Sequence, residues 1–185
     1  MKHTVLIDET AIAARVAELA ATIRADLTST SPVFVGLLTG SFVFVADLAR
    51  AASRVGLEPE VDFMAVSHYS AGTVASGRVE VYKDTARNLS GRAVLLIDDI
   101  LDSGHTMTLV RDHIARQGPA WLRTCALLDK PSRRQVEIQA DYVGFEVPDV
   151  WLVGYGLDAG GYGRALPYIA AVEPAAADSA GDDAR

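Results

Sequence analysis

The residues whose types and spacing suggest chemistry most clearly lie in one stretch, residues 93–107, which reads AVLLIDDILDSGHTM. Asp98 and Asp99 follow the uncharged apolar run VLLI, and such a run is typical of a strand buried on both faces of a parallel sheet. Carboxylates at the end of such a strand suit the hydroxyl groups of a sugar, or Mg²⁺ that is shared with a polyphosphate. The stretch therefore predicts a site for a sugar or for a metal-bound phosphate.

A short polar turn follows the acids, and a helix follows the turn. The residues of the turn are Asp102, Ser103, Gly104, His105 and Thr106. Met107, Val110 and Ile114 then recur at helical spacing. Because the N-terminus of a helix offers unpaired N–H groups and the positive end of its dipole, it suits a phosphate. One short segment is thus expected to hold a sugar and its phosphate, although acids in an ordinary strand–loop–helix connection can also be simply solvated.

The composition indicates one globular domain around this stretch. Half of the 185 residues are hydrophobic and 22% are charged, so we expect a single domain over residues 1–173 and a disordered, low-complexity tail over residues 174–185. A net charge of −7 without a basic cluster argues against nucleic-acid binding. The apolar runs are too short to span a membrane and no signal peptide is evident, so we expect a cytoplasmic protein. Cys125 is the only cysteine, which excludes an internal disulfide.

Apolar runs alternate with amphipathic patterns along the rest of the chain. We expect one helix over residues 10–27 and another that buries Phe42, Val45 and Leu48. Strands are expected over residues 33–38, 61–66, 94–97, 121–128, 142–143, 150–153 and, at one edge, 168–172. The alternation predicts an α/β fold with a doubly wound, mainly parallel sheet. Since ligands of such sheets bind beyond the carboxyl ends of the strands, the polar turns there are expected to converge.

The set of motifs resembles the type I phosphoribosyltransferases, and among them the hypoxanthine–guanine phosphoribosyltransferases. Residues 93–107 match the family's signature for phosphoribosyl diphosphate (PRPP). The other matching motifs are LLTGSF at 37–42, SHY at 67–69, VYKD at 81–84, LDKP at 128–131, VGFEVPD at 143–149, VGYGLD at 153–158 and LPYI at 166–169. The resemblance implies the type I phosphoribosyltransferase fold, with a flexible lid hairpin and a small hood. It also implies purine salvage, in which hypoxanthine or guanine reacts with PRPP to give IMP or GMP and pyrophosphate, with Mg²⁺ as cofactor.

The same resemblance implies roles for individual residues. Asp102 corresponds to the general acid/base that handles the N7 proton of the purine. The ribose and 5′-phosphate would be bound by Asp98, Asp99, Asp102, Ser103, Gly104, His105 and Thr106. The pyrophosphate would be bound by Thr39, Gly40 and Arg164, with a non-proline cis peptide before the glycine. The Mg²⁺ ligands would be Asp98, Asp99 and Asp158.

A purine pocket and a lid are implied in the same way. The purine would be bound by Lys130, Trp151, Leu152 and Asp158. Lys130 would donate to the exocyclic O6, Trp151 would stack on the base, and Leu152 would use its backbone. The lid would be the long polar loop over residues 67–77, between two alternating arms, and it would contain Ser67, His68 and Tyr69. Such a lid excludes water, so that PRPP is not simply hydrolysed.

Three departures from the family leave alternatives open. Thr39 stands where many relatives have a basic residue, His68 replaces a common serine, and residues 159–163 are unusually rich in glycine. A xanthine-preferring enzyme, and a catalytically weak regulator that senses PRPP or nucleotides, therefore remain alternatives. The implied partners are the small molecules PRPP and a 6-oxopurine base, together with further copies of the chain in a homodimer or homotetramer.

Overall fold

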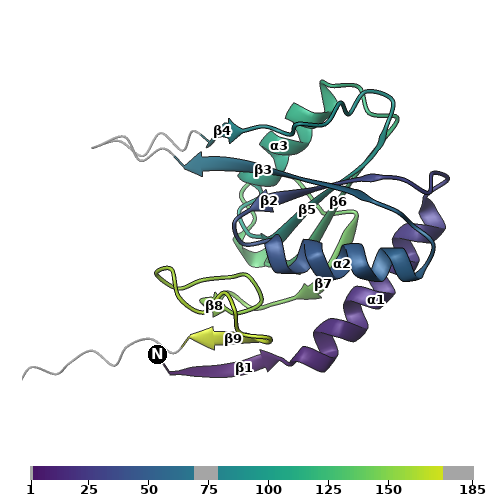
Figure 1. Ribbon diagram of the computed structural model, residues 1–185. Helices are drawn as coiled ribbons and strands as arrows, with labels where there is room; N and C mark the ends of the chain where they lie inside the picture. Colours follow the sequence, from purple (N-terminus) through teal and green to yellow (C-terminus); the bar gives the residue numbers. More distant parts are fainter. Residues whose placement is uncertain (1, 69–78, 173–185) are drawn as a thin grey trace, which may run out of the picture.

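A six-stranded sheet forms the middle of the molecule and leads into the polar turns described above (Figure 1). The computed structural model describes residues 2–68 and 79–172. The strands of this sheet are β2 (Val33–Leu38), β3 (Glu60–His68), β4 (Val79–Lys83), β5 (Ala93–Leu101), β6 (Trp121–Asp129) and β7 (Tyr142–Glu146). Their order is β4-β3-β2-β5-β6-β7, and all neighbours are parallel except β3 and β4. The predicted mainly parallel sheet is thus confirmed.

Helices cover both faces of this sheet, which confirms the doubly wound arrangement. One face is covered by α1 (Glu9–Asp26) and α2 (Phe42–Arg54), and the other by α3 (His105–Ala115). Residues 94–97 of β5 are fully buried, because their side chains alternate between the two covered faces.

α1 begins close to its predicted start, after a capping aspartate. Asp8 caps α1, since its side chain accepts a hydrogen bond from the N–H of Ala11 at 2.8 Å. In α2, Val45 and Leu48 are buried as expected. Phe42 was expected to be buried with them, but it is 41% exposed because it is the first residue of the helix and lies at its end.

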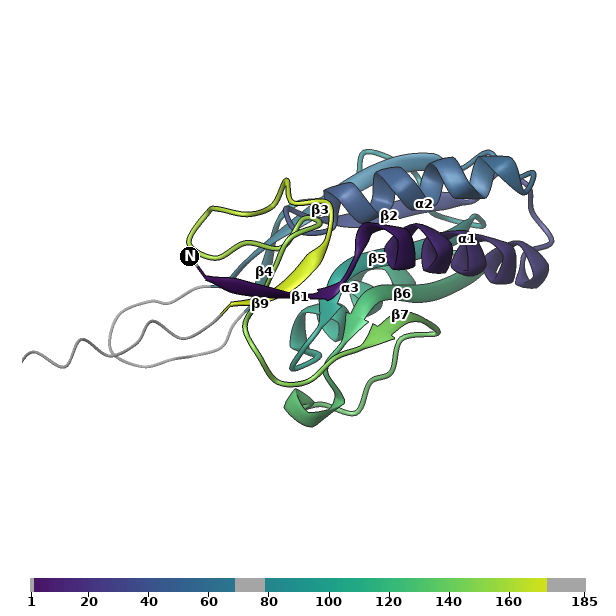
Figure 2. The same cartoon turned by 90° about the horizontal axis from the view of Figure 1, so that it is seen from below.

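A second, three-stranded antiparallel sheet stands beside the central sheet and forms the predicted hood (Figure 2). It contains β1 (His3–Ile7), β9 (Ile169–Val172) and β8 (Leu152–Val153), in that order. The edge position predicted for residues 168–172 is wrong, because β1 and β8 pair with the two sides of β9. The sequence did not predict β1, where Val5 and Leu6 are 46% and 44% exposed and no alternation marks a strand.

β5 is longer than its apolar run. It continues through Asp98 and Asp99 and pairs with β6 as far as the partners Leu101 and Asp129. Its pairing with β2, by contrast, ends at Ile97, because β2 soon turns toward α2. The acids therefore lie on a strand end that is paired on one side only, beside the turn after β2.

The hairpin predicted for the lid has the arms that the sequence indicated. β3 and β4 pair antiparallel, from Ala65 with Lys83 to His68 with Val79. Residues 69–78, which include Tyr69, and the predicted tail over residues 174–185 lie outside the described residues. In the part of the chain that is described, no helix is both long and apolar enough to cross a membrane.

Candidate active site

Asp98 and Asp99 lie at the end of β5 in surroundings that exclude most water. Asp98 is 8% exposed. Burial, and then the negative charge of Asp99, hold the pKa of Asp98 well above its usual range. Burial also raises the pKa of Asp99, although hydrogen bonds and the charge of Arg164 act in the opposite direction. Two buried carboxylates are stabilised by donors or cations that reach them, and sugar hydroxyls and Mg²⁺ are both suitable.

Gly40 allows this acid pair to approach the turn after β2. A Cβ atom at Gly40 would lie 1.7 Å from Oδ2 of Asp99, and one at Gly156 would lie 1.9 Å from the carbonyl oxygen of Gly40. No other residue type fits at these two positions without movement of a neighbour. The peptide bond between Leu38 and Thr39 is cis, which confirms the expectation of a cis peptide before the glycine. Three segments that are distant in sequence are thus stacked directly on one another.

A cleft of about 370 Å³ opens over these stacked segments. Its lining includes Leu38, Gly40, Asp98, Asp99, Asp102, Ser103, Gly104 and Thr106. Gly104 has a φ of 91°, and α3 begins at the next residue, so the first N–H groups of α3 border the cleft. The turn residue outside this lining is His105, whose Nε2 lies 3.3 Å from Oε1 of Gln135. The cleft therefore has acids on one side and a helix N-terminus on another, which suits a phosphorylated sugar.

Asp102 is oriented by a neighbouring arginine at the rim of the cleft. Nε of Arg133 lies 3.2 Å from Oδ1 of Asp102 and 3.7 Å from Oδ1 of Asp149. The side chains of Arg133 and Asp102 are 49% and 42% exposed, so the carboxylate of Asp102 is held by a cation and is still accessible. An accessible, oriented carboxylate can exchange a proton with a bound base.

Arg134 fastens the polar turn to the end of β6. Its guanidinium donates to the carbonyl of Leu101 at 3.0 Å and to the carbonyl of Asp102, and it forms an ion pair with Asp129. Because the guanidinium is planar and has five N–H donors, one side chain can serve all of these acceptors. The N–H of Lys130 also donates to the carbonyl of Leu101 at 3.0 Å. Lys130 and the polar turn before α3 are therefore fixed relative to each other.

Lys130 and Trp151 have environments that are unusual for their residue types. Lys130 is 7% exposed, and its Nζ donates to the carbonyl of Val150 at 2.8 Å, whereas Trp151 is 66% exposed. Leu152 is 5% exposed, so its side chain is in the core and its backbone is the part left for recognition. An ammonium has three N–H donors, and an exposed indole offers a face for stacking. The bond to Val150 thus brings a donor and a stacking surface to neighbouring positions.

Asp158 and Arg164 hold each other in the segment after β8. Nη2 of Arg164 lies 2.6 Å from Oδ1 of Asp158, and its Nη1 donates to the carbonyl of Gly156 at 2.7 Å. Oδ2 of Asp158 accepts a hydrogen bond from the N–H of Gly161 at 2.7 Å. A pyrophosphate that binds Arg164, or a cation that binds Asp158, must therefore replace this ion pair.

The carboxylates suit Mg²⁺ that is bound together with a substrate. In residues 2–68 and 79–172, no group of three or more His, Cys, Asp or Glu side chains is close enough to hold a metal ion alone. Asp98 and Asp99 therefore form one potential set of ligands, and Asp158 belongs to another. Mg²⁺ is commonly bound by one or two carboxylates plus phosphate oxygens and water, so the donor types present fit this mode.

A doubly wound sheet with paired acids and a helix N-terminus at one cleft is the arrangement of an enzyme for phosphorylated sugars. The family model of the phosphoribosyl transferase domain matches residues 5–159, and the chain belongs to this family. The family predicted from the motifs is thus confirmed.

The likeness to known proteins extends over nearly the whole chain. The chain is 48% identical to a hypoxanthine-guanine phosphoribosyltransferase of Aquifex aeolicus, covering 93% of this chain and 96% of that protein. It is 42% identical to a hypoxanthine-guanine phosphoribosyltransferase of Bacillus subtilis, covering 97% and 99%. A crystal structure of a hypoxanthine-guanine phosphoribosyltransferase from Bacillus anthracis has a TM-score of 0.85 and 40% identity, covering 92% of this chain and 98% of that one.

Sequence reasoning did not single out two arginines and a glycine that organise the site. Arg133 and Arg134 come three and four residues after Lys130, and the short helix η1 (Pro131–Arg133) returns them to the polar turn. The only sequence feature that could have indicated them is the pair of adjacent arginines shortly after Lys130. The contact of Gly156 with Gly40 has no local signal, because it joins segments that are more than 100 residues apart.

The Gly40–Asp99 contact predicts a specific non-additivity. Gly40→Ala should lower the free energy of unfolding by about 1–3 kcal/mol, because the new methyl group meets a buried carboxylate. In an Asp99→Ala background the same change should cost less, since the carboxylate is gone. Urea denaturation of both single variants and the double variant measures this difference. An equal cost in both backgrounds would contradict the contact.

The Arg134 contacts predict that lysine cannot replace this arginine. Arg134→Lys should destabilise the protein by about 2–3 kcal/mol, because a point charge cannot serve two carbonyls and a partly buried carboxylate together. Arg123→Lys is the matched control, since its pair with Asp141 is 50% and 38% exposed and should contribute less than about 1 kcal/mol. Equal urea midpoints for the two variants would show that Arg134 has no special role.

Proposed function

We propose that this protein transfers the 5-phosphoribosyl group of PRPP to hypoxanthine or guanine, forming IMP or GMP and pyrophosphate in purine salvage. The observation that carries this proposal is the cleft that combines the acid pair of β5 with the N-terminus of α3. A buried lysine at the end of the adjacent strand β6 supplies a donor for an oxopurine. The names of relatives that are 42–48% identical over most of their length support the same activity.

The reaction replaces one bond at C1 of the ribose by another. The bond from C1 to the pyrophosphate oxygen breaks, and the bond from C1 to N9 of the purine forms. Positive charge develops on the sugar during this exchange, as in glycoside cleavage. Asp102, as the general acid/base, takes the proton that the purine loses from N7. In the reverse direction the same group returns that proton.

The ribose phosphate would be held by the first strand–turn–helix segment. N–H groups and hydroxyls of the turn from Asp102 to Thr106 would bind the 5′-phosphate. Asp98 and Asp99 would accept hydrogen bonds from the ribose hydroxyls, directly or through Mg²⁺. His105 lies at the variable position of the motif, so we expect it to contribute only its backbone.

The pyrophosphate would be bound by Thr39, Gly40 and Arg164. Because the side chain of Thr39 is uncharged, the backbone N–H groups of the turn and the guanidinium of Arg164 would make most of the contacts with pyrophosphate. The ligands proposed for Mg²⁺ are Asp98 and Asp99 on one side and Asp158 on the other. When bound, Mg²⁺ neutralises the negative charge that the leaving pyrophosphate acquires.

The purine would be recognised by four residues: Lys130, Trp151, Leu152 and Asp158. The free N–H donors of Lys130 suit the O6 acceptor of hypoxanthine, guanine or xanthine, whereas adenine presents a donor at that position. Trp151 would stack on the ring. Ser67 and His68 belong to the end of β3, from which the proposed lid extends.

The direct test is a spectrophotometric assay with PRPP, Mg²⁺ and each of hypoxanthine, guanine, xanthine and adenine. Turnover of hypoxanthine or guanine without adenine is the expected result. Turnover of xanthine above the other bases would replace the proposal by a xanthine-preferring enzyme. Binding of PRPP or IMP without turnover of any base would instead indicate a nucleotide-sensing regulator.

A homodimer or homotetramer, and a location in the cytoplasm, stay predictions. Sedimentation equilibrium of the purified chain would measure the first, and fractionation of cells would test the second.

Asp102→Asn should lower kcat by about 10²–10⁴-fold and change the Kd of PRPP little, because an amide cannot accept the proton. Asp149→Asn is the matched control, since Asp149 lies beside the same Arg133 and has no proposed part in the chemistry. We expect its kcat to stay within about twofold of the wild type. An unchanged kcat for Asp102→Asn would remove Asp102 from the mechanism.

Lys130→Met should raise KM for hypoxanthine by at least about tenfold, because a charged hydrogen bond to O6 is lost. KM for PRPP should stay within about twofold, which steady-state kinetics with each substrate varied in turn would show. A change in KM for PRPP alone would mean that the lysine serves the phosphate side of the site.

A further inference from the structure

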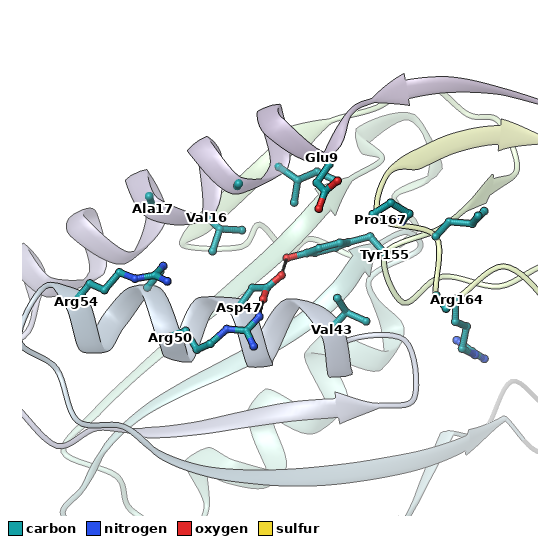
Figure 3. Close-up of a pocket in the computed structure, with 15 residues that line it drawn as sticks. Glu9, Val16, Ala17, Val43, Asp47, Arg50, Arg54, Tyr155, Arg164 and Pro167 are labelled. Carbon is teal, nitrogen blue, oxygen red and sulfur yellow. Dashed lines mark hydrogen bonds and ion pairs between the residues drawn. The ribbon is translucent and has the colours of Figure 1, made fainter.

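One partly buried hydrogen bond joins α2 to the segment that follows β8. The hydroxyl of Tyr155 donates to Oδ2 of Asp47 at 2.6 Å, at the wall of a cleft of about 380 Å³ between α1 and α2 (Figure 3). Tyr155 is 6% exposed and belongs to the hydrophobic core under these helices. Burial, and then the bond to Asp47, raise the pKa of Tyr155, so the hydroxyl remains a donor at neutral pH.

Asp47 moves with the turn that contains Gly40, because α2 begins almost directly after that turn. The hydroxyl of Ser41 donates to the carbonyl of Leu37 at 2.6 Å and ties the start of the helix to β2. The other carboxylate oxygen of Asp47 pairs with Arg50 on the next turn of α2. The acceptor of the hydrogen bond from Tyr155 is therefore fixed relative to the proposed pyrophosphate turn.

Tyr155, the donor of the bond, is fixed to the segment that contains Arg164. Its N–H donates to the carbonyl of Leu166 at 2.8 Å, and the N–H of Gly156 donates to the carbonyl of Arg164 at 2.9 Å. The guanidinium of Arg164 donates back to the carbonyl of Gly156 at 2.7 Å. Tyr155 has a φ of 48°, a left-handed conformation that a tyrosine keeps only where its surroundings determine it.

We propose that Asp47 and Tyr155 are a positioning pair that holds Arg164 and Asp158 against the pyrophosphate turn. This inference rests on the proposed function of that site. The contact of Gly156 with the carbonyl of Gly40 prevents closer approach of the two segments, but it does not prevent their separation. The hydrogen bond between Tyr155 and Asp47 prevents the separation. Asp47, Tyr155 and Arg164 all border the cleft between α1 and α2, and the charge of Arg164 also reaches Asp99 in the cleft over β5. The pair therefore acts on the site through Arg164 and its partner Asp158.

The proposal makes a distinction between two ligands of the same site. Of the residues that the pair positions, Arg164 is assigned to pyrophosphate alone and Asp158 to both ligands. IMP is held in addition by the 5′-phosphate turn and by Lys130, Trp151 and Leu152, which the pair does not position. Loss of the Asp47–Tyr155 bond should therefore weaken pyrophosphate binding much more than IMP binding. A general loss of folding would weaken both.

The experiment compares two tyrosine hydroxyls that donate to aspartates. Tyr155→Phe removes the proposed positioning bond. Tyr142→Phe is the matched control, because Tyr142 on β7 is also 6% exposed, donates to Asp26 at 2.7 Å and lines neither of the two clefts. Titration calorimetry of the full chain measures Kd for pyrophosphate with Mg²⁺, and separately Kd for IMP. Urea denaturation of each variant measures its stability.

We expect Tyr155→Phe to raise the Kd of pyrophosphate by about five- to tenfold and to leave the Kd of IMP within about twofold. Tyr142→Phe should change neither Kd, with a similar loss of stability. Asp47→Asn keeps an acceptor for the hydroxyl and should bind pyrophosphate nearly as the wild type does, whereas Asp47→Ala should resemble Tyr155→Phe. Wild-type Kd values in Tyr155→Phe, or equal weakening of both ligands, would overturn the proposal.

Hydrogen–deuterium exchange keeps this test separate from the test of function. Amides of residues 156–164 should exchange faster in Tyr155→Phe than in Tyr142→Phe, whether or not a ligand is present. Equal exchange in the two variants would overturn the positioning pair. A wild type that binds neither pyrophosphate nor IMP would overturn the proposed function, and the exchange result would still decide the role of the bond.

Discussion

Gly40, Asp99 and Gly156 are stacked so closely that neither glycine has room for one more carbon atom. This steric constraint sets the separation of three chain segments: the turn after β2, the end of β5 and the segment after β8. Each segment then positions polar groups that the others lack. The turn after β2 presents backbone groups, and the end of β5 presents the carboxylates of Asp98 and Asp99. The segment after β8 presents the ion pair of Arg164 with Asp158. The cleft lies where the first two of these segments meet, beyond the point where β2 and β5 stop pairing.

Two groups of attractive contacts connect the elements around this steric contact. Arg134 joins the end of β6 to the turn before α3, with an ion pair and backbone acceptors in one partly buried cluster. Asp47 and Tyr155 join α2 to the opposite side. Each cluster contains a side chain that is largely buried, Arg134 in the first and Tyr155 in the second, and this makes their geometry specific. Burial also raises the pKa values of Asp98 and Asp99. A bound substrate or cation would balance the charge of these two carboxylates.

The sequence predicted those features whose determinants are local. The strand–turn–helix segment at residues 93–107 is specified by its own apolar run, acids and glycine, and the structure has it almost as predicted. The hood was predicted only from resemblance, because β1 pairs with β9 across more than 160 residues and shows no alternation of its own. Trp151 illustrates the same limit. It is exposed beside a buried strand, and only tertiary packing decides that.

The pairing of β1 with β9 also determines when the protein can finish folding during its synthesis. The central sheet from β2 to β7 can assemble from segments that the ribosome releases one after another. β1 leaves the ribosome before all of them, and its partner β9 is made after all of them. β1 must therefore wait unpaired while the rest of the domain forms. The hood, and with it the exposed indole of Trp151 beside β8, is completed last, so a nascent chain acquires the polar turn before α3 well before the segment around Trp151.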